Sequence, residues 1–116
     1  MRILLACLLL AHGVVHLVGF LGAWAPSRTP VAAHRADLGA GWSKLVGWLW
    51  LAGSIGFGIA AVGALAGAGW WPALAMGLAG GSLTLCVLQL PQTRFGIVMN
   101  ISLIAALIGG HRVGWF

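Results

Sequence analysis

Two histidines, His12 and His16, lie one helical turn apart in a long apolar stretch near the start of the sequence. Residues four positions apart share one face of a helix, so both imidazoles would point in the same direction. Imidazole binds metals, forms hydrogen bonds and carries protons, and an ionisable side chain inside an apolar segment favours a functional site. This pair is the first candidate for chemistry in the chain.

A metal on this pair would need at least a third protein ligand. The single acid, Asp37, and a third histidine, His34, lie outside the long apolar stretches. His111, Cys7 and Cys86 lie close to the ends of such stretches, at other depths than the His12–His16 pair. We therefore predict no metal site within one chain, and haem or a pigment only with a ligand from a partner chain.

Further polar side chains fall at a similar depth to His16 if each apolar stretch is a helix that rises about 1.5 Å per residue. The candidate ligand-binding residues are His12, His16, Ser54, Thr84, Asn100 and Ser102. An unpaired polar group in hydrocarbon is costly, so we expect this layer to converge between the helices. Two interpretations stay open: a structural hydrogen-bond network, or a pocket for a headgroup, a quinone or another small amphiphile.

The composition indicates what positions these side chains. Of 116 residues, 61% are hydrophobic and 6% are charged, whereas soluble domains carry about 25% charged residues. That excludes a soluble domain, a disordered chain and a coiled coil, and indicates an integral membrane protein. About 20 apolar residues cross a bilayer as a helix. Four such spans, at about 3–24, 45–67, 71–90 and 95–110, predict an all-α four-helix transmembrane bundle that forms one domain over 1–116.

The longest connection, residues 25–43, predicts a further short helix. Thr29 and Pro30 are a helix-start signal, and Gly39 and Gly41 are expected to stop the helix, so 31–38 would lie at the membrane interface. The seven tryptophans support the four spans, because indoles prefer the interface and each Trp lies at or near an expected boundary.

The basic residues lie at the ends of the apolar stretches, which does not fit nucleic-acid binding and is typical of membrane flanks. Arg28, Arg35, Lys44 and Arg94 fall on the side of the first and third loops, whereas Arg2 and Arg112 fall on the side of the termini. The excess of Lys and Arg predicts that the first and third loops are cytoplasmic and that both termini are outside.

Small residues recur at four-residue spacing in the second and third spans, and such stripes let helices approach closely in lipid. The candidate helix-packing residues are Gly56, Ala60, Gly77 and Gly81. They could pack within the bundle, or against a second copy of the chain or another membrane protein.

Three stretches carry a family resemblance: His12 to Phe20 (His-Gly-x-x-His-x-x-Gly-Phe), Val46 to Leu51, and Pro91 to Gly96 together with Asn100. With them the chain resembles small uncharacterised four-helix bacterial membrane proteins and, more distantly, is similar to DoxX-like proteins. The resemblance implies a bacterial inner-membrane protein and implies no activity.

The sequence thus predicts a structural or accessory subunit of a membrane complex, with no catalytic residue and with the lipid bilayer as its surroundings. The first alternative is binding or transport of a small lipid or quinone by the histidine layer. The second is a haem- or pigment-binding redox subunit.

Overall fold

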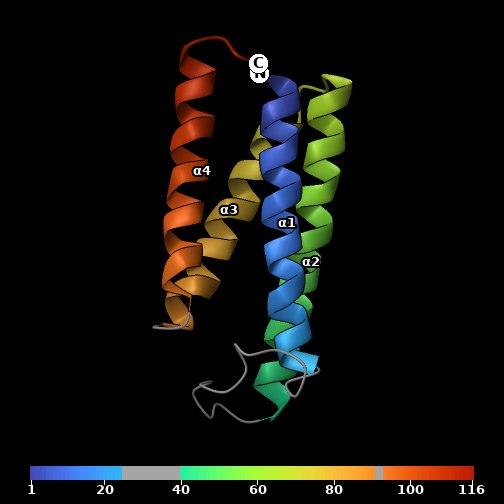
Figure 1. Ribbon diagram of the computed structural model, residues 1–116, viewed down its shortest axis with the longest axis vertical. Helices are drawn as coiled ribbons and strands as arrows, with labels where there is room; N and C mark the ends of the chain where they lie inside the picture. The colour runs from blue at the N-terminus through green and yellow to red at the C-terminus, as the bar shows by residue number, and fades with distance from the viewer. Residues whose placement is uncertain (25–39, 91–92) are drawn as a thin grey trace.

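The computed structural model describes residues 1–24, 40–90 and 93–116, and these form four helices and no strand. The helices are α1 (Arg2–Trp24), α2 (Ala40–Ala66), α3 (Trp71–Leu88) and α4 (Arg94–Arg112). They run alternately up and down, so that both termini lie at one end of the molecule (Figure 1). The all-α class predicted from the sequence is confirmed.

Each of the four helices is long and apolar enough to cross a membrane. The molecule measures 45 × 22 × 20 Å, and a bilayer is about 40–45 Å thick with its headgroups. Large aliphatic side chains such as Ile3, Ile55 and Ile101 are exposed on the outside of the helices. The chain therefore has the features of a multi-pass membrane protein.

Three helix boundaries differ from the sequence-based expectation by two residues or more, and one of them is the end of α3, at Leu88 rather than near 90. α2 begins at Ala40 rather than near 45, so Gly41, expected to be a stop signal, lies in its first turn. A helix tolerates glycine at its end, where little packing or hydrogen bonding is lost. α4 reaches Arg112 instead of ending near 110. The expected interfacial helix at 31–38 falls outside the described residues.

Glycine in the left-handed conformation ends two of the helices. Gly67 and Gly114 both have φ of 70°. After α2, the Ala68 amide donates to the Gly63 carbonyl at 3.0 Å, and after α4 the Trp115 amide donates to the Gly110 carbonyl at 2.9 Å. This is the Schellman pattern, which satisfies carbonyls that the helix leaves unpaired.

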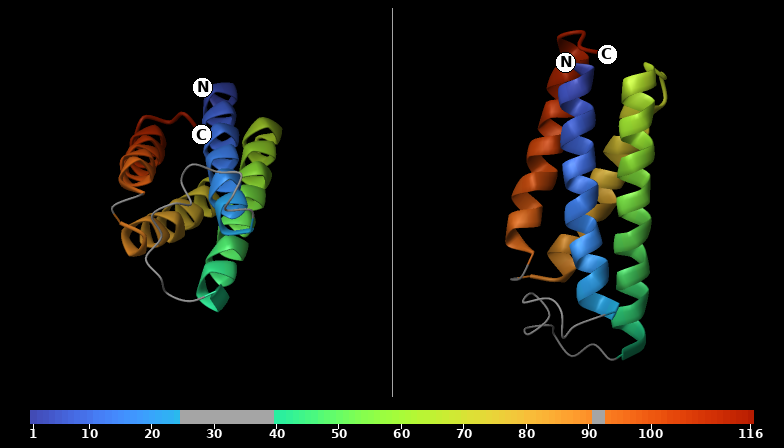
Figure 2. Two further views of the ribbon diagram at one scale, coloured as in Figure 1. Left: turned by 60° about the horizontal axis from the view of Figure 1, so that its bottom comes forward. Right: turned by 45° about the vertical axis from the view of Figure 1, so that its right-hand side comes forward.

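The helices pack as successive antiparallel pairs, and α1 and α2 form the most extensive contact (Figure 2). Glycines set the close approach of these two helices. A Cβ added to Gly13 would lie 3.1 Å from the Ser54 carbonyl oxygen, and one added to Gly47 would lie 2.7 Å from the Ala23 Cβ. α1 and α4 do not form a comparable contact.

The main core lies toward the end of the bundle that holds the termini. Its fully buried members include Leu5, Leu9, Phe57, Trp71 and Leu107, which come from all four helices. α2 supplies three alanines, Ala60, Ala61 and Ala64, each 0% exposed.

Of the two small-residue stripes expected from the sequence, the one on α2 packs within the bundle and the one on α3 is exposed. Gly56 faces α3, since a Cβ there would lie 2.8 Å from a methyl carbon of Leu78, and Ala60 is buried in the core. Gly77 and Gly81 are exposed, and a Cβ on either would meet no atom within 4 Å. α3 turns its buried alanines, Ala75 and Ala79, toward the core instead. These alanines lie two residues from Gly77 and Gly81, about 200° around a helix at 3.6 residues per turn.

Five tryptophans are exposed, four of them near helix ends, and two are buried. Exposed are Trp24, Trp42, Trp48, Trp70 and Trp115, as expected for interface residues. Trp71 is 1% exposed and its ring lies 4.7 Å from that of Phe116. Trp50 is 5% exposed and lies well inside α2, because the helix begins earlier than expected. The interface interpretation does not hold for these two residues.

Candidate ligand-binding site

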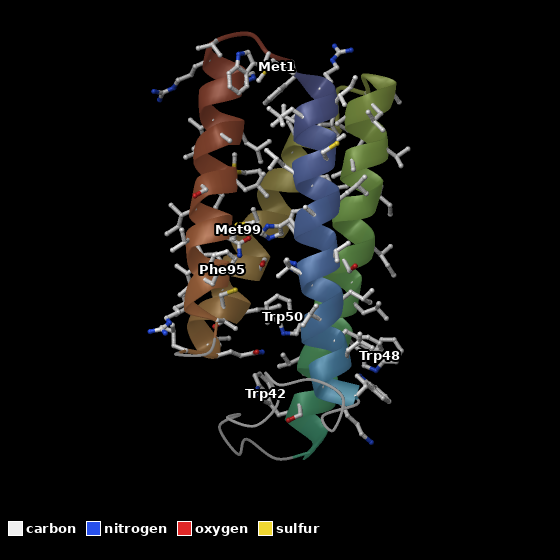
Figure 3. The ribbon with its side chains drawn as sticks, in the orientation of Figure 1. Met1, Trp42, Trp48, Trp50, Phe95 and Met99 are labelled. Atoms are coloured by element: carbon white, nitrogen blue, oxygen red, sulfur yellow. The ribbon has the colours of Figure 1, made fainter. Side chains whose placement is uncertain are left out.

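A cavity of about 320 Å³ lies between the helices in the half of the molecule away from the termini. All four helices line it: His12, Val15, His16, Val18, Gly19 and Gly22 from α1; Trp42, Ser43, Val46 and Trp50 from α2; Ser82, Cys86 and Leu88 from α3; Phe95, Gly96, Met99 and Asn100 from α4; and Gln89, Leu90 and Thr93 between α3 and α4. Figure 3 shows Trp50, Phe95 and Met99 around the space between α1 and α4. This volume is at the lower end of what small-molecule sites offer.

The two histidines lie side by side on the face of α1 that packs on α2. Both are buried, at 3% and 2% exposure, and their ring centroids are 4.9 Å apart. The Nδ1 of His16 lies 3.0 Å from the carbonyl oxygen of His12. Because a carbonyl can only accept, Nδ1 carries the hydrogen and donates it, which leaves Nε2 for another partner.

Gly53 makes room for the His16 ring against α2. A Cβ on Gly53 would lie 2.7 Å from His16 Cδ2. The ring is held edge-on between Trp50 and Phe57, with centroid distances of 4.8 and 5.1 Å. His12 packs edge-on against the same Phe57 at 4.6 Å. The histidine pair is therefore held against α2 by contacts with Gly53, Trp50 and Phe57.

The ring of Trp50 packs closely against Gly19 of α1. A Cβ on Gly19 would lie 2.8 Å from Cδ2 of the indole, so only a glycine admits the ring there. Trp50 also packs in one cluster with Cys86 of α3. The indole of Trp50, a residue of α2, thus packs against α1 and lies in one cluster with a residue of α3.

Asn100 joins α4 to α3 with a side-chain hydrogen bond. Its Nδ2 donates to Ser82 Oγ at 2.9 Å and to the carbonyl of Gly96, on its own helix, at 2.9 Å. Because the Gly96 carbonyl only accepts, this second bond fixes which end of the amide is nitrogen. The same Nδ2 lies 3.8 Å from Cys86 Sγ. Asn100 Oδ1 is thereby turned away from its own helix.

Four buried polar atoms in this region lack a hydrogen-bond partner: His12 Nε2, His16 Nε2, Trp50 Nε1 and Asn100 Oδ1. Each belongs to a residue that lines the cavity. The Asn100 side chain lies within interaction range of His12, so α4 and α1 present polar groups to each other there. Buried polar groups are almost always paired, so such a cluster calls for a physical explanation.

The structure brings together only part of the polar layer expected from the sequence. His12, His16 and Asn100 line the cavity. Thr84 is exposed and its hydroxyl donates to the Gly80 carbonyl of its own helix at 3.1 Å. Ser102 is exposed on α4, and Ser54 is half-buried on α2 without lining the cavity. These three residues have the expected depth but point in other directions.

Ser82, Cys86 and Trp50 are part of the site although the sequence did not suggest them. The register of the α3–α4 pair is the signal that finds the first two. Cys86 faces Gly96, where a Cβ would lie 2.7 Å from its Sγ, and Ser82 faces Asn100 one turn further along. In an antiparallel pair each step of four back along α3 matches a step of four forward along α4.

The described residues that line the cavity include no Lys, Arg, Asp or Glu. Within the described ranges no three His, Cys, Asp or Glu side chains form a group that could hold a metal ion. Polar atoms from His12, Trp50 and Asn100 and apolar walls such as Val15 and Met99 are what this site offers a ligand. Hydrogen bonding and apolar contact are therefore its available chemistry.

No protein-family model, curated protein or solved structure matches this chain.

Proposed function

We propose that this protein binds a small amphiphilic molecule, such as a lipid or a quinone, in the cavity between its four helices. One observation carries the proposal: four buried polar atoms without partners belong to residues that line one largely apolar cavity. Leaving such atoms unpaired is unfavourable, whereas a ligand with a polar head would pair them. An apolar tail would contact the remaining walls.

Mass spectrometry of the protein released from a mild detergent tests this function. We expect a bound small molecule of defined mass on the unmodified protein and on Ser102→Leu, since residue 102 is exposed on α4. We expect this molecule to be lost from Asn100→Leu, because leucine has a volume similar to that of asparagine but carries no amide. A ligand retained equally by both variants, or absent from all three proteins, would contradict the proposal.

A structural or accessory subunit is the second function that we propose. The observation in its favour is the exposed face of α3 with Gly77 and Gly81, where a Cβ would meet nothing. Small residues on a lipid-facing surface allow a second copy or a partner helix to approach closely. The same mass spectra distinguish the two functions, because a stoichiometric protein partner without a small ligand would favour the subunit. Haem or pigment binding would need a further axial ligand from such a partner.

We also propose that the protein lies in the bacterial inner membrane, as its resemblance to four-helix bacterial proteins implies. The excess of basic residues around the first and third loops supports cytoplasmic loops there, with both termini outside. Lys44 and Arg94, which lie at that end of the bundle, fit this orientation. Lys44 Nζ lies 5.7 Å from the centre of the Trp24 ring, a pairing suited to the headgroup region.

Cysteine labelling from either side of the membrane tests the topology. Gly69→Cys lies in the turn between α2 and α3 and Arg94→Cys at the start of α4, and both positions are exposed. With Cys7→Ser and Cys86→Ala as background, we expect an impermeant reagent added outside to label position 69 only. Labelling of both positions from one side would contradict four spans. Labelling of position 94 alone from outside would contradict the predicted orientation and would leave the four spans in place.

A further inference from the structure

The unpaired atoms of the cavity specify which kind of polar head fits. Asn100 uses its amide hydrogens on Ser82 Oγ and the Gly96 carbonyl, so Oδ1 remains as an acceptor that needs a donor. Trp50 Nε1 is a donor only, and it needs an acceptor. A complementary head must therefore both donate and accept.

The two groups belong to the same part of the cavity. Asn100 Nδ2 lies 3.8 Å from Cys86 Sγ, Trp50 belongs to the same cluster as Cys86, and all three residues line the cavity. His12 Nε2 is a third buried atom without a hydrogen-bond partner at this cavity.

The charge of the head is also restricted. Among the described lining residues none is a Lys, Arg, Asp or Glu, so a charged head would have no counter-charge in an environment of low polarity. Fatty acids, anionic phospholipid heads and amines are therefore disfavoured.

We infer that the ligand is a neutral amphiphile with a hydroxyl head, which donates to Asn100 Oδ1 and accepts from Trp50 Nε1. This inference rests on the proposed ligand-binding function. A long-chain alcohol or acylglycerol and a hydroquinone share this chemistry, whereas an ether or an oxidised quinone accepts but cannot donate.

A set of probes that share a ten-carbon chain tests the head: 1-decanol, decyl methyl ether, decanoate, decylamine and decyl hydroquinone. Each is added to the purified protein at the same mole fraction of the detergent micelle, and binding is measured as the increase in the unfolding midpoint. We expect 1-decanol to bind roughly tenfold more tightly than its ether, because the ether leaves the Asn100 acceptor unpaired. Decanoate and decylamine should bind more weakly than 1-decanol.

Two variants separate the contributions of the partners. Asn100→Leu should remove the preference for alcohol over ether, since only the alcohol donates. Trp50→Phe should weaken both probes and keep their ratio, since both oxygens accept from the indole. Ser102→Leu, on the exposed face of α4, should leave all affinities unchanged.

Equal binding of alcohol and ether to the unmodified protein, or tighter binding of a charged probe, would overturn the hydroxyl inference and leave the ligand-binding function in place. If no probe binds, the proposed function itself fails. Decyl hydroquinone binding more tightly than 1-decanol would identify a quinol as the source of the hydroxyl, and the reverse order would identify a lipid alcohol.

Discussion

Replacing Gly53 by leucine should clearly lower the unfolding midpoint of the protein in detergent, because Gly53 lies at the contact of α2 with α1. A Cβ at this position would already lie 2.7 Å from His16 Cδ2. Trp50 and Phe57 pack edge-on against the imidazole and its Nδ1 donates to the His12 carbonyl, so a shift of the ring would disrupt these contacts. Either the ring leaves these contacts or the helices separate, and overpacking of this kind costs about 1–3 kcal/mol.

Gly58 provides the matched control for this change. It lies on the same helix, and a Cβ there would meet no atom within 4 Å. Gly58→Leu should leave the midpoint nearly unchanged. Combining Gly53→Leu with His16→Ala should restore part of the stability, because the clash is with the imidazole. Equal midpoints for the two leucine variants would show that the histidine does not lie against Gly53.

Composition and length were sufficient to predict four helices, since few charged residues and long apolar runs leave a chain little other choice. The predicted spans near 71–90 and 95–110 differ from α3 and α4 by at most two residues at either end. The predicted start of the second span, at 45, lies five residues after the start of α2 at Ala40, because the continuous apolar run begins only after Lys44. That error also moved Trp50 from the interior of a helix to an apparent boundary.

Of the six candidate ligand-binding residues, the structure places His12, His16 and Asn100 along the cavity and directs Ser54, Thr84 and Ser102 elsewhere. Thr84 and Ser102 have the right depth, but each lies two residues from the side chain that faces inward, Ser82 and Asn100 respectively. Two residues correspond to about 200° around a helix, so such neighbours point to opposite sides. Depth follows from counting residues along one helix, whereas direction depends on which face packs on the neighbouring helix.

The register of the α1–α2 contact could have supplied that direction. In this antiparallel pair the facing position on α2 moves back as the position on α1 moves forward: His16 faces Gly53, Gly19 faces Trp50 and Ala23 faces Gly47. In the first two pairs a large side chain meets a glycine, and a Cβ on Gly47 would also lie 2.8 Å from Nε1 of the Trp24 indole. Such alternation of large and small side chains is visible in a sequence once two helices are known to be antiparallel neighbours.

Trp50 is the large residue whose removal tests this arrangement most directly. Trp50→Ala would leave an empty space beside Gly19 and His16, because the indole packs closely against α1 and on the imidazole at 4.8 Å. In lipid the exposed and buried states are both apolar, so the loss comes from packing contacts rather than from transfer out of water. We therefore expect a loss of roughly 2 kcal/mol, the lower end of large-to-small changes in protein cores.

Trp48→Ala is the matched control for this change, since Trp48 lies two residues away on α2 and is 54% exposed. Its ring lies 5.5 Å from that of Trp24 and 6.1 Å from that of Phe20, and both of these residues are partly exposed. We expect the unfolding midpoint of Trp48→Ala to be close to that of the unmodified protein in the same detergent. The midpoint of Trp50→Phe should lie between those of the two alanine variants, because phenylalanine keeps an aromatic ring beside Gly19. Equal midpoints for Trp48→Ala and Trp50→Ala would mean that the indole of Trp50 does not join α2 to α1.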